Sequence, residues 1–214
     1  MSDLKKISIS GPAGNLEGIW HLPDACAETG RSDEPTAVAV IAHPLPTMGG
    51  NMEHKIVTTL AKTFVELGYA ALRFNFRGVG NSEGEFDSGN GEIEDLLAMV
   101  QHARDEFGHL PLILSGFSFG GYVTARAAQH LRPQAHKLVL IAPAVGRFQM
   151  PHVPHNTLVL HGEHDEVISL ADALDWARPQ HLPIVVLPEA GHFFHGRLSQ
   201  LKQIVLHEFH GCRL

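Results

Sequence analysis

The stretch 112-LILSGFSFGGYV-123 decides how the rest of the chain is interpreted. An apolar run ends at Gly116, a single hydroxyl stands at Ser118, and another glycine follows at Gly120. Glycines on both sides fit a tight turn from a buried strand into a helix, because a Cβ would clash where the backbones approach. Such a turn exposes the serine oxygen, which becomes a nucleophile if a base removes its proton. The alternative is an ordinary turn in which Ser118 has no chemical role.

Apolar runs and helical patterns alternate on both sides of this stretch. The run 36–43 lacks polar alternation, which fits a strand buried on both faces. Strands that alternate with helices predict a mostly parallel sheet covered by helices, so we expect an eight-stranded α/β fold over residues 1–214, in one domain. Residues 144–155 hold two prolines and are too short for a cap or lid domain. The expected strands are 5–10, 16–22, 36–43, 69–76, 111–116, 136–143, 156–162 and 183–188, and the expected helices are 53–68, 91–108, 119–131, 169–180 and 196–211.

Composition narrows the class of protein. The chain has 214 residues, of which 44% are apolar, and a formal net charge of −7, which argues against a nucleic-acid partner. No apolar run is long enough to span a membrane, and the first residues lack the apolar core of a signal peptide. The two cysteines, Cys26 and Cys212, form no CxxC motif. We therefore expect a cytoplasmic protein with a small-molecule partner, of an oligomeric state that the sequence does not indicate.

Three polar residues follow three of the predicted strands. Ser118 follows the central strand, Asp165 follows a later one, and His192 follows the last. Parallel strands carry their ligands at their carboxyl ends, so these side chains are expected at one edge of the sheet. A histidine can take the proton of a serine, and an aspartate can hold that histidine in the required tautomer. We therefore expect Ser118 as nucleophile, Asp165 as acid and His192 as base.

Neighbouring residues offer alternatives for two of these roles. Glu163 and Glu166 flank Asp165, and His195 lies three residues after His192. The pattern G-x-x-D-x-V before a helix favours Asp165, and the position directly after the last strand favours His192.

Two segments of the sequence resemble metal or cofactor motifs. His161, His164 and Asp165 form a compact H-x-x-H-D that a zinc ion could use, but no H-E-x-x-H motif occurs. The glycine-rich segment 77-RGVGNSEG-84 has the wrong spacing for a dinucleotide loop. We expect neither a metal nor a cofactor.

The reaction also needs donors for a developing oxyanion. The N–H of Phe119 lies at the start of the predicted helix, where it can face that charge. A second donor is expected from 43-HPLPTMGGN-51, whose two prolines have no N–H, which leaves Leu45 among the first three residues after the histidine. Thr47 or Met48 would replace Leu45 if the loop folds back.

These motifs together resemble the α/β-hydrolase superfamily, and within it the small, lidless group near the dienelactone hydrolases. The order nucleophile, acid, base and the motif G-x-S-x-G carry the resemblance. Dienelactone hydrolases proper have a cysteine at the position of Ser118, and the usual His-Gly of the oxyanion loop is His43-Pro44 here. The resemblance places Arg77 and Ser82 in a structural turn near the site. The matching segments are 43-HPLPTMGGNMEHK-55, 73-RFNFRGVGNSEGEFDSGNGEIEDL-96, 116-GFSFGGYV-123, 160-LHGEHDEVI-168 and 189-EAGHFFHGRL-198.

The resemblance implies a serine hydrolase that cleaves small or exposed esters through an acyl-serine. A thioesterase or acyl-transferase with the same three residues is one alternative. A non-catalytic ligand-binding protein that keeps the fold is another.

Overall fold

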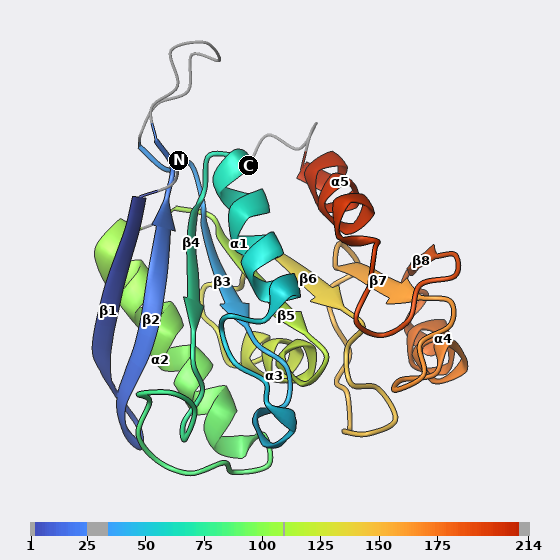
Figure 1. The fold of residues 1–214 in the computed structure, drawn as a ribbon, viewed down its shortest axis with the longest axis horizontal. Coiled ribbons are helices and arrows are strands. Elements are labelled where there is room, and N and C mark those ends of the chain that lie inside the picture. Colours follow the sequence, from blue (N-terminus) through green and yellow to red (C-terminus); the bar gives the residue numbers. More distant parts are fainter. Residues whose placement is uncertain (1–2, 25–33, 109, 210–214) are drawn as a thin grey trace.

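A computed structural model describes residues 3–24, 34–108 and 110–209. Eight strands form one sheet in the order β1-β2-β4-β3-β5-β6-β7-β8 (Figure 1). Strand β2 pairs antiparallel with β1 and β4, and every other pair is parallel, which confirms the predicted fold class. The strands are β1 (Asp3–Gly11), β2 (Gly14–Leu22), β3 (Val38–Ala42), β4 (Ala70–Phe74), β5 (Leu112–Phe117), β6 (Lys137–Ile141), β7 (Leu158–Gly162) and β8 (Val185–Leu187).

Helices cover both faces of this sheet. Helices α1 and α5 pack on one face, and α2, α3 and α4 pack on the other (Figure 1). The helices are α1 (Lys55–Glu66), α2 (Asn90–Phe107), α3 (Phe119–Ala128), α4 (Leu170–Ala177) and α5 (Leu198–Phe209), with short 3₁₀ turns η1 (Pro46–Met48) and η2 (Arg178–Gln180).

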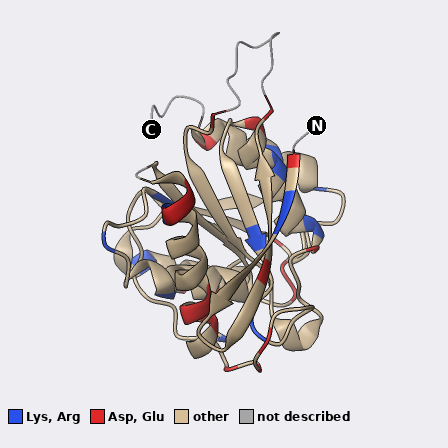
Figure 2. Ribbon diagram, turned by 90° about the vertical axis from the view of Figure 1, so that its left-hand side faces the viewer, with Lys and Arg blue, Asp and Glu red and all other residues tan. Residues whose placement is uncertain are grey.

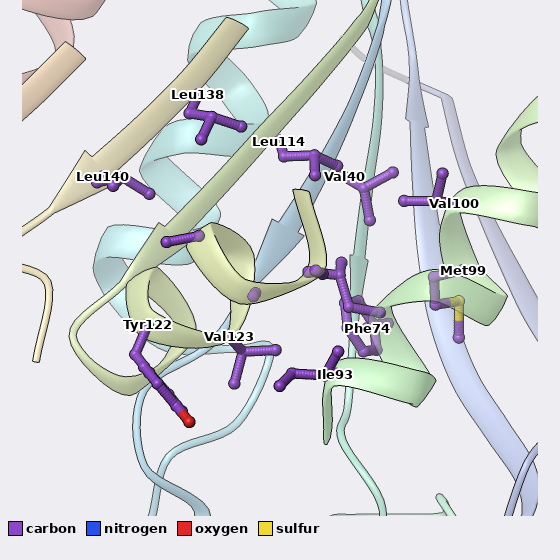
Figure 3. Close-up of a cluster of buried hydrophobic side chains, with 14 of the residues drawn as sticks. Val40, Phe74, Ile93, Met99, Val100, Leu114, Tyr122, Val123, Leu138 and Leu140 are labelled. Carbon is purple, nitrogen blue, oxygen red and sulfur yellow. The ribbon is translucent and has the colours of Figure 1, made fainter. Parts of the chain in front are cut away.

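Strand β3 shows why the central strands have no polar alternation. Val38 and Val40 enter the core beneath α2 and α3, whereas Ala39 and Ile41 enter the core beneath α1 and α5. Figure 3 shows Val40 on the first of these faces, among side chains from α2 and α3. Because both faces are buried, every residue of β3 is apolar.

The turn after β4 is held by a buried ion pair. The guanidinium of Arg77 donates to both carboxylate oxygens of Asp95 on α2, at 2.8–3.1 Å. Ser82 donates its hydroxyl to the carbonyl of Asn75 at 2.8 Å. These contacts fix the glycine-rich segment 77–84 as a structural turn, with no helix directly after it.

The described part of the chain shows neither a membrane-spanning helix nor, on the β1 side, a basic face. Among the described residues, no helix has both the length and the apolar character needed to cross a membrane. Figure 2, which views the β1 side, shows acidic and basic residues interspersed rather than gathered into a basic face.

Cys26 and Cys212 lie outside the described residues, as does most of the polar segment 24–35. The one-domain organisation and the cytoplasmic location stay predictions.

Candidate active site

Ser118 lies on a strained turn between β5 and α3. Its backbone has φ 55° and ψ −118°, a conformation that a residue with a side chain rarely adopts. The neighbouring glycines are required by space, because a Cβ on Gly116 would lie 2.2 Å from the carbonyl oxygen of Gly120. A Cβ on Gly120 would lie 2.4 Å from the carbonyl oxygen of Ala42 in β3. The turn thus presents the serine hydroxyl at the carboxyl end of the sheet.

A chain of hydrogen bonds joins Ser118 to two residues that are remote in sequence. The Oγ of Ser118 lies 3.0 Å from Nε2 of His192, and Nδ1 of His192 lies 2.7 Å from Oδ2 of Asp165. If Nδ1–H donates to Asp165, then Nε2 accepts the serine proton. The structure therefore brings together the three residues that the sequence proposes as nucleophile, base and acid.

The carboxylate of Asp165 is held by backbone as well as by His192. Its Oδ1 accepts the N–H groups of Val167 at 2.9 Å and Ile168 at 2.7 Å. Burial by itself would raise the pKa of Asp165, but the hydrogen bonds from His192 and from these two N–H groups outweigh it and hold the pKa below its usual range. The side chain is therefore ionised at neutral pH and can stabilise an imidazolium.

The alternative acids and the alternative base lie elsewhere. Glu166 accepts the backbone N–H of His192 at 3.1 Å, so it supports the loop after β8. Glu163 accepts another backbone N–H of that loop at 2.9 Å. The ring of His195 lies 2.8 Å from the ammonium of Lys55 on α1. Each of the three has a contact that does not involve the serine.

His161 supports the loop after β7, which carries Asp165. It is fully buried, and its Nε2 lies 3.0 Å from the carbonyl of Ile168 and 3.6 Å from Asp165. Burial lowers the pKa of His161 despite these two neighbours, so the neutral ring donates to Ile168. His164, its partner in the H-x-x-H-D motif, is exposed. Within the described ranges no three His, Cys, Asp or Glu side chains are grouped to hold a metal.

The predicted oxyanion donors share a pocket with the serine. Leu45 and Phe119 line it together with Ser118, and Thr47 does not. Met48 also lines the pocket, but its N–H donates to the carbonyl of Leu45 at 3.1 Å. This arrangement favours Leu45 over the two alternatives, and its role stays a prediction.

His43 is a supporting residue that the sequence analysis missed. It is fully buried, its Nδ1 lies 2.7 Å from the carbonyl of Pro44, and its Nε2 accepts the N–H of Phe76 at 3.1 Å. Burial lowers the pKa of His43 to about 4, with a smaller contribution from His54, although the Pro44 carbonyl opposes the shift. The neutral ring therefore ties the loop that carries Leu45 to the end of β4. The signals in the sequence were a histidine directly after a buried strand and the position of His43-Pro44 at the usual His-Gly of the oxyanion loop.

Comparison with known proteins agrees with this geometry. A family model described as serine aminopeptidase S33 matches residues 33–152, more than half of the chain. A crystal structure of XC6422 from Xanthomonas campestris, described as an α/β serine hydrolase without a lid, is 36% identical, covers 97% of this chain and 94% of its own, and has a TM-score of 0.89. The chain belongs to the α/β serine hydrolases.

Two more relatives extend this result. An α/β serine hydrolase homologue from Coxiella burnetii is 35% identical, covers 97% of each chain and has a TM-score of 0.82. Protein RP471 of Rickettsia prowazekii is 28% identical over 94% of this chain and 87% of its own length. The predicted superfamily is confirmed, whereas the narrower grouping near the dienelactone hydrolases stays a prediction.

The active-site pocket of this α/β hydrolase is open and mostly apolar. Its volume is about 520 Å³, and the loop after β6 contributes one wall where a lid domain would be inserted. His54 also lines the pocket: its Nδ1 accepts the N–H of Ile56 at 3.3 Å and its ring stacks on Phe117 at 5.0 Å. Burial, and then Lys55, lower the pKa of His54 to about 4, so it is neutral. The lining residues are Pro44, Leu45, Met48, Gly49, Gly50, His54, Ser118, Phe119, Ala144, Arg147, Phe148, Val167, Ile168, His192 and Phe193.

Proposed function

We propose that this α/β hydrolase is a carboxylic-ester hydrolase that cleaves small or exposed esters through an acyl-serine. The observation that carries the proposal is the hydrogen-bonded series Ser118–His192–Asp165, which opens onto an apolar pocket of about 520 Å³. A serine, a histidine and a buried carboxylate in this order are the groups that acyl transfer requires.

The proposed reaction has two halves. Nε2 of His192 takes the proton of Ser118 as Oγ attacks the ester carbonyl, and the N–H groups of Leu45 and Phe119 stabilise the oxyanion. The C–O bond to the alcohol then breaks, and the alcohol leaves with the proton from His192. A water molecule attacks the acyl-serine, His192 takes its proton, and the acid departs as the proton returns to Ser118. Asp165 stabilises the imidazolium in both halves.

The lining of the pocket favours esters over peptides with a free amino end. The matching family model is named for an aminopeptidase, and such an activity calls for a carboxylate that pairs with the ammonium of the substrate. No Asp or Glu belongs to the described residues that line the pocket, and its one permanently charged side chain is Arg147. An ammonium would therefore meet a like charge.

The proposal is tested with Ser118→Ala and 4-nitrophenyl butyrate. We expect turnover to fall on the order of 10⁶-fold and labelling by a fluorophosphonate probe to disappear. Ser199→Ala, which changes an exposed serine on α5, is the matched control and should retain both. Ester turnover by the Ser118→Ala protein would contradict the proposal. A faster reaction with the butyryl thioester would instead assign the thioesterase alternative, and failure of the wild-type protein to react with the probe would favour the non-catalytic one.

A further inference from the structure

The pocket wall formed by the loop after β6 carries an isolated positive charge. Arg147 is the one Lys, Arg, Asp or Glu among the described residues that line the pocket. The loop is fixed to the nucleophile turn, because the N–H of Ala144 donates to the carbonyl of Ser118 at 3.1 Å. The N–H of Phe148 in turn donates to the carbonyl of Ala144 at 3.1 Å. Arg147 is therefore attached to the same frame as the reacting hydroxyl.

The guanidinium of Arg147 is held by a hydrogen bond but has no carboxylate partner among the described residues. One N–H of Nη2 donates to the carbonyl of Val167 at 3.4 Å, which joins the loops after β6 and β7 at the pocket. A guanidinium has five N–H donors, so four are left for other partners. Asp172 packs against the neighbouring Gly146, yet Arg147 forms no ion pair within the described part of the chain.

The positive charge of Arg147 contrasts with the negative net charge of the chain and with the apolar walls of the pocket. The chain has a net charge of −7, which repels anions at long range. The remaining walls of the pocket are mostly apolar, and His54 is neutral above about pH 4. Arg147 lines the pocket but is itself exposed, so solvent screens its attraction for an anion and the expected preference is modest.

We propose that Arg147 selects esters that carry a carboxylate, such as half-esters of short dicarboxylic acids or esters of carboxylated alcohols. This inference rests on the proposed esterase function and adds the substrate class. The guanidinium binds the carboxylate through its free N–H groups, and the ester carbonyl lies at Ser118. A pocket of about 520 Å³ restricts such substrates to small molecules.

Two pairs of substrates, matched in size and different in charge, test the proposal. 4-Nitrophenyl hydrogen glutarate against 4-nitrophenyl 4-carbamoylbutanoate places the anion on the acyl side. 3-Carboxyphenyl butyrate against 3-carbamoylphenyl butyrate places it on the alcohol side. The quantity measured is the ratio of kcat/KM for the anionic ester to that for the neutral ester, and the pair that responds shows which part of the substrate Arg147 contacts.

The variants are Arg147→Gln and Arg147→Lys, with Arg178→Gln as the control. Arg178 is exposed at the end of α4 and pairs with Asp175, so its loss changes the net charge equally but not the pocket. We expect Arg147→Gln to lower the ratio about fivefold in at least one pair, as for a partly solvated ion pair. Arg147→Lys should keep part of the preference, Arg178→Gln should keep all of it, and 0.5 M salt should reduce it.

An unchanged ratio in both pairs would overturn the inference and leave the esterase proposal intact. Binding provides a readout that does not depend on turnover, because a Ser118→Ala protein binds esters without cleaving them. On that background Arg147→Gln should weaken binding of the anionic ester about fivefold and leave the neutral ester unaffected. If the wild-type protein cleaved no ester but this difference in Kd were found, the esterase proposal would fail and the selectivity of the pocket would stand. Equal Kd values with and without Arg147 would refute the selectivity.

Discussion

Replacing His43 by leucine tests whether a buried neutral imidazole holds the oxyanion loop. The variant loses the partners of two buried backbone groups, the carbonyl of Pro44 and the N–H of Phe76. Each unsatisfied group costs about 1–3 kcal/mol, so we expect the free energy of unfolding at pH 7 to fall by about 2–6 kcal/mol. Because Pro44 directly precedes Leu45, we also expect kcat for an ester to fall at least about tenfold, part of what a lost oxyanion donor costs.

The same variant should change how stability depends on pH. The pKa of His43 is about 4 in the folded protein, whereas an unfolded histidine has a pKa near 6.5. Between these values the unfolded state binds a proton that the native state does not. The contribution of His43 to stability is therefore complete above about pH 6.5 and declines as the pH falls toward 4. From pH 7 to pH 5.5 this decline is about 1 kcal/mol, and it should be absent in His43→Leu.

Urea unfolding at pH 7 and pH 5.5 measures both effects. The control is His207→Leu, which removes an exposed histidine of α5 and should unfold like the wild-type protein at pH 7. His21 and His54, whose pKa values are also lowered to about 4, remain in both variants, so the wild-type protein and the control share their pH dependence. If His43→Leu were as stable as the control, or lost as much stability as the wild-type protein between the two pH values, the assigned role of His43 would be wrong.

Three further substitutions probe the parts of the site separately. Asp165→Asn should lower kcat about 10⁴-fold, because an amide no longer favours the tautomer in which Nδ1 of His192 carries the proton; activity measured beside a thermal melt separates this from unfolding. Gly120→Ala should destabilise the fold by at least about 3 kcal/mol, because its Cβ would lie 2.4 Å from a backbone oxygen of β3, and a melting temperature near that of the wild-type protein would contradict this. Asp95→Asn should cost about 3–5 kcal/mol, because it removes the buried anion of Arg77 and leaves only the exposed Glu94, 3.4 Å from the guanidinium, as chemical unfolding would reveal.

The strand segments and the clustering of Ser118, Asp165 and His192 could be predicted because their signals are local. The apolar residues of β3 face two cores, so a run without polar alternation is sufficient evidence for a buried strand. Ser118, Asp165 and His192 each follow a strand, and parallel strands end at one edge. Three residues that the sequence marks separately are therefore brought to one edge of the sheet.

The ends of elements were less predictable because long-range contacts decide them. The last strand was expected over 183–188, but β8 is limited to Val185–Leu187, where it pairs with β7 at the edge of the sheet. The third helix was expected to reach 131, but α3 ends at Ala128. The strand or helix propensity of the sequence continues beyond the ends of β8 and α3. The pairing and packing that stabilise the two elements stop at those ends.

The supporting roles of His43 and Arg147 could not be predicted, because they depend on backbone groups that are distant in sequence. His43 connects its own loop to Phe76, 33 residues away, and nothing in the sequence of either segment indicates that contact. The same is true of Arg147 and the carbonyl of Val167, 20 residues further along. A pattern that reports the chemistry of a residue does not report which carbonyl or N–H it will meet after folding.

The three proposed catalytic residues are packed so that little of each is exposed, although the site has no lid. Ser118 and Asp165 are each 8% exposed and His192 is 3% exposed, although the pocket above them is open. The rings of Phe117 in β5 and of Phe193 in the loop after β8 lie 5.0 and 5.1 Å from that of His192. Water is thus kept from the carboxylate and the imidazole by the fixed structure, so the proposed electrostatic support of the reaction needs no closing movement.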